Sequence, residues 1–151
     1  MLDAAIYEKL SSFCAYQERC KADVLDKLYK LKVPKDDFDV YLAKLQDQNF
    51  LNEERYTKAF ISAHSKKKWG KTKIKSALSG KRIDGELIKK YLDLIEEADY
   101  DDQIKELLQK KWKSMRTGTP KDKKNKLIRF LLSKGFEMGK VMTAVKGIGV
   151  Q

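Results

Sequence analysis

The chain has 151 residues, 36% of them charged and 42% hydrophobic, and its formal net charge is +11. It contains only two prolines and eight glycines, too few for a β-sandwich, which needs turn residues every ten positions or so. The hydrophobic content argues against wholesale disorder, and the composition as a whole favours long, solvated helices.

A pattern of apolar residues occurs three times. Apolar residues lie nine and five positions before Val33, and five, nine and twelve positions after it; the same spacing recurs around Ile83 and Phe136. Steps of three or four residues indicate one buried helical stripe, and the five-residue steps mark a short turn between two helices. The eighteen positions are Val24, Leu28, Val33, Phe38, Leu42, Leu45, Ile74, Leu78, Ile83, Ile88, Leu92, Ile95, Leu127, Leu131, Phe136, Val141, Val145 and Ile148.

The first predicted repeat covers residues 1–50. Its leading helix is expected from about Asp3 to Tyr16, with Ile6, Leu10 and Phe13 on one face. Pro34 is expected in the first turn of the third helix, where a missing amide proton is tolerated. The charge of this repeat is nearly balanced, with eight basic and nine acidic residues.

The second predicted repeat covers residues 51–98. Asn52 is expected to cap its leading helix. The stripe expected to be buried on that helix consists of Tyr56, Ala59, Phe60 and Ala63. Gly80 is expected to end the second helix in a left-handed conformation, and Asp84 to cap the third.

The third predicted repeat covers residues 99–151. The stripe expected on its leading helix consists of Ile104, Leu107, Leu108, Trp112 and Met115. Thr119, Pro120 and Asp122 together have the pattern of a helix start, as N-cap, first helical residue and acidic partner. Gly135 is expected to adopt the left-handed conformation at the end of the second helix.

These elements predict an all-α protein of three tandem three-helix repeats that form one continuous repeat domain. A three-helix unit of ~50 residues is marginal alone, so neighbouring repeats are expected to stack and complete each other's cores, as in solenoids. We therefore expect an elongated, curved array.

The sequence offers little for catalysis or for cofactor binding. It has a single histidine, His64, no glycine-rich phosphate loop and no nucleophile elbow, so we expect a protein that is not an enzyme and has no cofactor. Cys14 and Cys20 with His64 are too few ligands for a metal site, and we interpret both cysteines as reduced and partly buried. Without a signal-peptide pattern or an apolar run of ~20 residues, we expect a soluble, cytoplasmic protein.

Positive charge is concentrated in the second and third repeats. Residues 51–98 contain twelve basic and seven acidic residues, and residues 99–151 contain thirteen and six. This segregation suits a polyanionic partner, although a lysine-rich solvated surface explains the overall composition equally well. The candidate binding residues are Arg55, Lys66, Lys67, Lys68, Trp69, Gly70, Lys71, Lys73, Lys75, Lys81, Arg82, Lys123, Lys124, Lys126 and Arg129.

We interpret the tract from Lys66 to Lys75 as a binding surface, whereas the tract around Lys123 suits a solvated helix face equally well. Gly70 and the amides after it are expected to form a helix start that accepts phosphate. Trp69 suits either stacking on a base or packing beside a tight turn. Because lysine dominates over arginine, contact with the nucleic-acid backbone or with a nucleoprotein is favoured over reading of base edges.

The chain resembles the RecX family of bacterial regulators of the RecA recombinase over about residues 3–146. The resemblance is carried by Phe50–Tyr56 with Ala59 and Phe60, by Lys68–Gly70 with Lys73, Ile74 and Leu78, by Lys81–Ile83, and by Phe130–Phe136. The first repeat matches less well: residues 21–28 follow the family's pattern, but Cys20 stands where a small hydroxyl residue is commoner. The turn Lys81-Arg82-Ile83 lacks the family's glycine, and we expect its geometry to be altered.

The resemblance implies a protein that lies in the groove of the RecA–DNA filament, and we expect it to be monomeric. It implies modulation, expected to be inhibition, of ATP hydrolysis and strand exchange by RecA, and so an effect on recombination and DNA repair. It also implies direct contact with single- or double-stranded DNA. The alternative that the residues leave open is a general nucleic-acid-binding helical-repeat protein without specificity for RecA.

Overall fold

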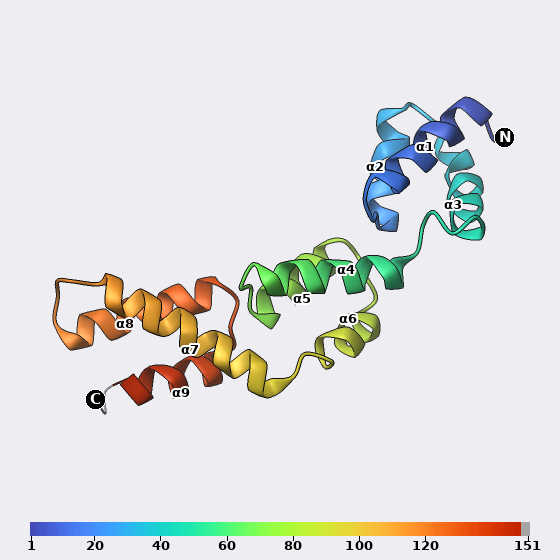
Figure 1. Cartoon of the computed structure of the whole chain (residues 1–151). Coiled ribbons are helices and arrows are strands. Elements are labelled where there is room, and N and C mark those ends of the chain that lie inside the picture. Colours follow the sequence, from blue (N-terminus) through green and yellow to red (C-terminus); the bar gives the residue numbers. More distant parts are fainter. Residues whose placement is uncertain (149–151) are drawn as a thin grey trace. The chain divides into compact units, whose positions relative to one another are not determined.

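The computed structural model describes residues 1–148, so the last three residues of the third predicted repeat lie outside the described part. Within residues 1–148 the chain forms nine α-helices and one 3-10 helix, and no strand (Figure 1). This confirms the all-α repeat fold. No helix in the described part of the chain is long and apolar enough to cross a membrane.

The helices follow the three predicted sets in chain order. The first set is α1 (Ala4–Tyr16), α2 (Lys21–Lys30) and α3 (Phe38–Asp47), with the 3-10 helix η1 (Lys35–Asp37) before α3. The second is α4 (Glu53–Lys66), α5 (Lys71–Gly80) and α6 (Gly85–Leu92), and the third is α7 (Glu97–Ser114), α8 (Pro120–Ser133) and α9 (Met138–Ile148). Because α7 begins at Glu97, the boundary predicted between residues 98 and 99 falls inside its first turn; the repeat boundaries stay a prediction.

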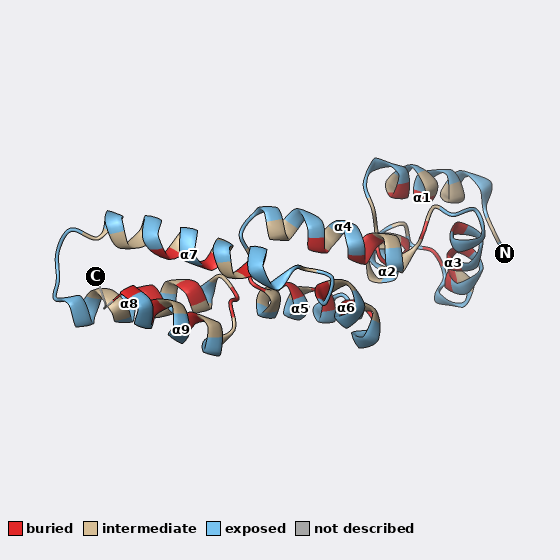
Figure 2. Cartoon of the chain, turned by 60° about the horizontal axis from the view of Figure 1, so that its bottom comes forward, coloured by how far each residue is buried: buried red, intermediate tan, exposed pale blue. Residues whose placement is uncertain are grey.

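The apolar pattern is the buried core. Of its eighteen positions, seventeen are buried, and only Ile95 is half-buried. Leu28, Leu78 and Leu131, which occupy the same position in the three repeats, are all 0% exposed. Figure 2 shows this burial as inward-facing stripes on α7, α8 and α9. The helical register predicted from spacing is therefore confirmed.

The described chain divides into two compact units. One comprises residues 1–60 and 78–88, and the other residues 61–77 and the chain from residue 89 on. The first unit holds a core built by α1, α2 and α3, including Leu10, Leu28 and Leu45. The second unit holds a core built by α7, α8 and α9, including Ile104, Leu127 and Val141.

The turn after the second helix has the same backbone geometry in every repeat. Lys32, Arg82 and Gly135 all have positive φ, at 60°, 60° and 94°. In each case the next residue's amide donates to the carbonyl five positions earlier, at 3.1 to 3.2 Å, which is the Schellman arrangement. The altered turn expected at Arg82 is therefore wrong, because arginine adopts the conformation that glycine would take. Gly135 takes its expected left-handed role, but Gly80 does not, since it lies within α5.

Most predicted helix starts are confirmed, including the cap at Thr119, whose hydroxyl accepts from the Asp122 amide at 3.1 Å. The Asn52 side chain likewise accepts from the Arg55 amide at 2.9 Å. Pro34 was wrongly assigned to the first turn of a helix: it precedes η1, and α3 begins only at Phe38.

The stripe predicted for α4 is only partly confirmed: Tyr56 is buried and Phe60 is half-buried. Ala59 and Ala63 are exposed, whereas Thr57 and Ile61, four residues apart, are 0% and 6% exposed. Thr57 tolerates burial because its hydroxyl donates to the Glu53 carbonyl at 2.7 Å. On the other leading helices the expected residues are at least partly buried: α1 buries Leu10, and Trp112 packs against the core of the second unit.

Candidate nucleic-acid interface

Three consecutive lysines lie at the end of α4 and in the turn that follows it. Lys66, Lys67 and Lys68 are all exposed, and Lys68 adopts a positive φ of 68° that closes the helix. Their only ion pair in the described structure is long, with the Lys68 amine 4.0 Å from a Glu106 carboxylate oxygen. Ion pairs between exposed side chains contribute little, so these three charges remain available to an external polyanion.

The helix start at Gly70 is already occupied. The Gly70 amide donates to the Lys134 carbonyl at 2.7 Å, and the Thr72 amide donates to the Gly135 carbonyl at 2.9 Å. The Lys71 amide donates to the Tyr100 hydroxyl at 3.0 Å. The predicted phosphate site at this helix start is therefore wrong, because its donors bind groups of the third repeat instead.

Gly70 allows the main chain at the start of α5 to approach the main chain of the turn after α8 closely. It is buried, and a Cβ atom placed on it would lie 2.2 Å from the Gly135 carbonyl carbon. A Cβ atom on Gly135 would in turn lie 2.2 Å from Cβ of Lys73. The physical role of Gly70 is therefore packing against the turn after α8, where no side chain fits.

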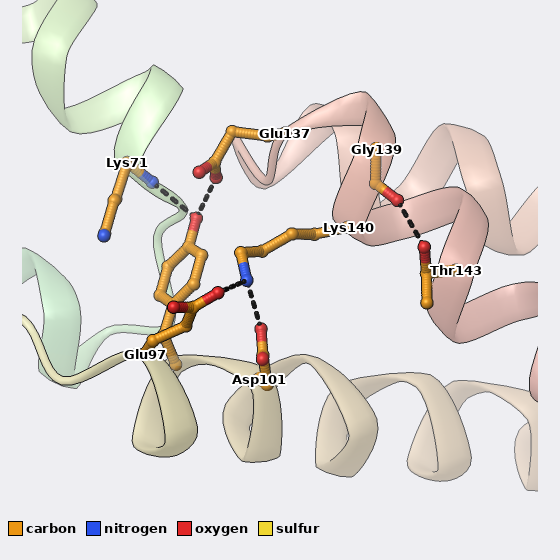
Figure 3. Close-up of polar contacts among 8 residues, drawn as sticks. Lys71, Glu97, Asp101, Glu137, Gly139, Lys140 and Thr143 are labelled. Atoms are coloured by element: carbon orange, nitrogen blue, oxygen red, sulfur yellow. Dashed lines mark hydrogen bonds and ion pairs between the residues drawn. The ribbon is translucent and has the colours of Figure 1, made fainter.

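The hydroxyl of Tyr100 links α5 to the third repeat (Figure 3). It accepts from the Lys71 amide and donates to the Glu137 carboxylate. Burial, and then the hydrogen bond to Glu137, raise the pKa of Tyr100, so this phenol stays protonated. On the same helix, Glu97 and Asp101 hold the Lys140 amine at 3.0 and 2.7 Å.

Trp69 packs against neighbouring side chains, but its ring is partly exposed, so its predicted roles in packing and in base stacking both stay open. The His64 ring lies 4.4 Å from it, centre to centre, so this histidine packs against an aromatic ring rather than standing free in solvent. The Lys73 amine lies 4.3 Å from the centre of the Trp69 ring, within the range of cation–π attraction. Trp69 and Lys73 line a shallow groove of about 430 Å³ that Ser76 and Ser133 share.

The lysines of α5 do not share one face. Residues two apart on a helix point to nearly opposite sides, which separates Lys73 from Lys75. Lys73 lines the groove towards α8, whereas the Lys71 amine lies 4.9 Å from the Tyr100 ring centre. The predicted Lys66–Lys75 tract is therefore not one continuous contact surface.

In the third repeat, Lys123, Lys126 and Arg129 are spaced by three residues and lie along one stripe of α8. Lys126 and Arg129 are exposed, while the amine of half-buried Lys123 lies 5.3 Å from the Trp112 ring centre. Lys124 is not part of this stripe, because it lines a different groove between α8 and α9.

Two of the predicted binding residues are used inside the first unit. The Arg55 guanidinium donates to the Glu18 carboxylate at 2.5 Å and to the carbonyls of Asn49 and Phe50. The Lys81 amine donates to Asp23 at 2.6 Å. Both carboxylates come from the preceding repeat, whereas residues 55–83 contain no acidic residue of their own. Arg82 is exposed and needs its left-handed backbone for the turn.

Comparison with known proteins matches the second and third repeats to domains of a known family. The family model for the second three-helix domain of RecX matches residues 52–92, and that for the third matches residues 98–145. Regulatory protein RecX of Acinetobacter baylyi is 30% identical over 132 residues, which cover 87% of this chain and 80% of that protein. The chain belongs to the RecX family.

A further RecX protein and a RecX crystal structure are also similar to this chain. Regulatory protein RecX of Clostridium botulinum is also 30% identical, and the match covers 85% of this chain but 61% of that longer protein. The crystal structure of RecX from Lactobacillus salivarius superposes with a TM-score of 0.85 at 24% identity, over 98% of this chain and 97% of that one. This likeness supports the fold, and the RecX family is one of regulatory proteins.

In this RecX chain the structure adds two lysines that were not singled out in the sequence. The Lys111 and Lys134 amines lie 5.0 and 5.9 Å from the ring centre of Phe130. Lys73 on Trp69 is a third lysine of the second unit whose amine lies over an aromatic ring. Residues 107–121 and 123–136, in which these two lysines lie, contain no acidic residue, but the pairing of a lysine with a ring depends on which helices pack together.

Proposed function

We propose that this RecX-family protein regulates the RecA recombinase by binding the RecA–DNA filament as a monomer. In this proposal it inhibits ATP hydrolysis and strand exchange by RecA, and so affects recombination and DNA repair. Its contact surface is the basic surface of the second unit, defined as Lys66, Lys67, Lys68, Lys73, Lys111, Lys123, Lys126, Arg129 and Lys134. The observation that carries the proposal is membership of a family of regulatory proteins together with this surface.

The charge distribution supports a polyanionic partner. The chain carries a formal net charge of +11, and few of the lysines on the basic surface are paired with carboxylates inside the chain. Lysine and arginine side chains at such a surface neutralise phosphates and release counterions, which gives affinity without base specificity. A filament built on DNA presents phosphates together with protein, and it suits a surface of this kind.

ATP hydrolysis by RecA on single-stranded DNA tests the proposal. Sub-stoichiometric amounts of the chain should lower the steady-state rate, because one regulator bound in a filament affects many protomers. The same assay should be run with excess competitor single-stranded DNA that carries no RecA. If inhibition survives the competitor, recognition of the filament is supported.

The second candidate, a general nucleic-acid-coating protein, predicts a different result. The pairing of lysines with Trp69 and Phe130 is its supporting observation, since such surfaces bind single strands without sequence preference. In that case inhibition would appear only at concentrations that coat the DNA, and competitor DNA would abolish it. That outcome would contradict the proposed regulation of RecA.

A further inference from the structure

An exposed tyrosine ends α1 beside a fixed arginine. Tyr16 is 83% exposed, and Arg19 follows it in the link to α2. The Arg19 Nε donates to the Phe13 carbonyl at 3.0 Å. Its guanidinium carbon lies 3.7 Å from the Phe13 ring centre and 6.0 Å from that of Tyr16. The guanidinium is thus held over the Phe13 ring and near the Tyr16 ring, while most of Tyr16 is exposed to solvent.

The surface around these side chains is hollowed and basic. One side of α1, together with Arg19 and Lys27, lines a hollow of about 630 Å³. The small residues Ala5 and Ser12 leave room within it, and Lys9 and Lys27 contribute amines. Glu8 is the one acidic residue in the lining, and none of the ion pairs found within residues 1–148 involves Lys9, Arg19 or Lys27.

We propose that this cluster, the Tyr16 platform (Lys9, Phe13, Tyr16, Arg19 and Lys27), binds single-stranded nucleic acid. A base stacks on the open Tyr16 ring, and the neighbouring guanidinium supplies cation–π and stacking contact. Lys9 and Lys27 neutralise the phosphates that flank that base. Stacking on an aromatic side chain tolerates any sequence, because every base has a π-face. The platform adds base contact to the phosphate contacts of the proposed function, on which it rests.

The chemistry of the hollow favours a nucleic acid over a protein partner. An anchoring site for a protein needs an apolar surface that excludes water around the aromatic residue. Here Tyr16 lines the same hollow as two lysines and an arginine, whose charges suit a polyanion. The first repeat as a whole is nearly balanced in charge, so this positive cluster is a local feature and not a consequence of net charge.

Binding of two fluorescent strands to the full-length chain tests the platform by anisotropy. One strand is an oligothymidylate of about 16 nucleotides, near the upper site size of single-strand binders. The other has the same length, with abasic sugars in place of the bases. We expect wild type to bind the base-bearing strand more tightly, on the order of ten-fold for one stacked base. Tyr16→Ala should lose most of that preference, and Tyr16→Phe should keep it.

Tyr29→Ala is the matched control. Tyr29 is also largely exposed, at 74%, and lies on α2 of the same unit, but its ring contacts Phe38 edge-on. This variant should retain the preference for bases. Helical content measured by circular dichroism should be the same in all three variants, because both tyrosines are solvent-exposed.

Three results would overturn the platform. Equal affinity of wild type for the two strands would show that no base is stacked. An unchanged preference in Tyr16→Ala would place the stacking elsewhere. If Tyr16→Ala weakened only the inhibition of RecA and left both strand affinities unchanged, Tyr16 would be a protein contact. A failure of the proposed function would be seen in a different experiment. It would appear as a lack of effect on ATP hydrolysis by RecA filaments, whatever the affinities for the two free strands.

Discussion

The two units join neighbouring repeats by different chemistry at equivalent positions. In the first unit the start of α2 meets the second repeat through side chains: the Lys21 amide donates to Glu53 at 2.8 Å, and Lys81 donates to Asp23 at 2.6 Å. We term these contacts the first junction. In the second unit the start of α5 meets the third repeat through main-chain hydrogen bonds of Gly70 and Thr72. We term these the second junction.

The difference follows from two positions. Cys20 and Gly70 each lie thirteen residues before the central apolar residue of their repeats, Val33 and Ile83. The turn that each junction contacts has Arg82 in the first unit and Gly135 in the second at its left-handed position. In the second junction, Gly70 and Gly135 have no side chains, so the two main chains contact each other directly. In the first junction, Cys20 and Arg82 carry side chains, and the repeats are joined by hydrogen bonds to the carboxylates of Glu53 and Asp23 instead. One repeat geometry therefore supports two kinds of junction.

The largest effect is expected when the glycine contact is removed. Gly70→Ala would place a Cβ 2.2 to 2.3 Å from main-chain atoms of Gly135 and Phe136, which cannot rotate away. We expect a loss of about 3 kcal/mol in the free energy of unfolding, from overpacking and lost hydrogen bonds. Chemical denaturation followed by circular dichroism measures it.

Gly80→Ala, at the other end of α5, is the control for that variant. A Cβ there would meet nothing within 4 Å, and alanine favours a helix over glycine by up to about 1 kcal/mol. We expect a small gain in stability. Equal losses in the two glycine variants would mean that the close contact with Gly135 is unimportant.

A smaller effect is expected from breaking the ion pair of the first junction. Asp23→Asn removes the partner of Lys81, and the loss should be about 1 kcal/mol, since the carboxylate is largely buried but the amine is 46% exposed. Asp26→Asn on the same helix is the control. Its pair with Lys30 is exposed on both sides, so its loss should be within about 0.5 kcal/mol.

The same pair predicts a pH dependence. Burial raises the pKa of Asp23, but the hydrogen bonds from Lys81 and from Cys20 outweigh it and leave this pKa below its usual value of 3.8. A lowered folded-state pKa means that the pair stabilises the fold above pH 3.8 and that this contribution is lost as the pH falls further. Wild type should therefore lose stability more steeply than Asp23→Asn on acidification below that pH. Parallel stability curves would show that Asp23 is not paired in solution.

The smallest effect concerns Arg82, which like Lys32 holds a left-handed turn position without being glycine. Arg82 has a φ of 60°, which costs an L-residue roughly 1 kcal/mol, whereas glycine adopts it freely. Arg82→Gly should raise stability by up to about 1 kcal/mol, reduced by the greater freedom of glycine in the unfolded chain. Thermal unfolding measures the change. A clear loss would mean that the Arg82 side chain makes a stabilising contact, and that the turn does not simply tolerate it.

Spacing alone predicted the register of the core, because Leu28, Leu78 and Leu131 must face inward on any helix with that period. It failed for Ala59 and Ala63, since alanine is apolar enough to fit a stripe and small enough to lie in solvent. The close contact of Gly70 with Gly135 joins residues far apart in sequence, and no local pattern encodes it.

The candidate site was less predictable for the same reason. Arg55 and Lys81 lie within residues 55–83, which contain no acidic residue, yet Glu18 and Asp23 pair with them from the first repeat. The local sequence shows where charged residues lie, but it does not show which distant carboxylates pair with them in the folded chain. Lys66, Lys67 and Lys68 are exposed at the end of α4, so their role as a contact surface stays a prediction.

The salt dependence of DNA binding tests the central claim most directly. The tract variant changes Lys66, Lys67 and Lys68 to Gln, and the matched control changes Lys30, Lys32 and Lys35. Each set removes three exposed charges and includes one left-handed lysine, Lys68 or Lys32. The slope of log affinity against log salt should flatten by about 0.7 for each lost phosphate contact on single strands.

For the tract variant we predict a slope flatter by up to about 2, together with weaker inhibition of ATP hydrolysis by RecA. The control should keep both the slope and the inhibition close to wild type. Equal changes in the two variants would show that only net charge matters. An unchanged slope in the tract variant would contradict the basic surface of the second unit as the place where nucleic acid binds.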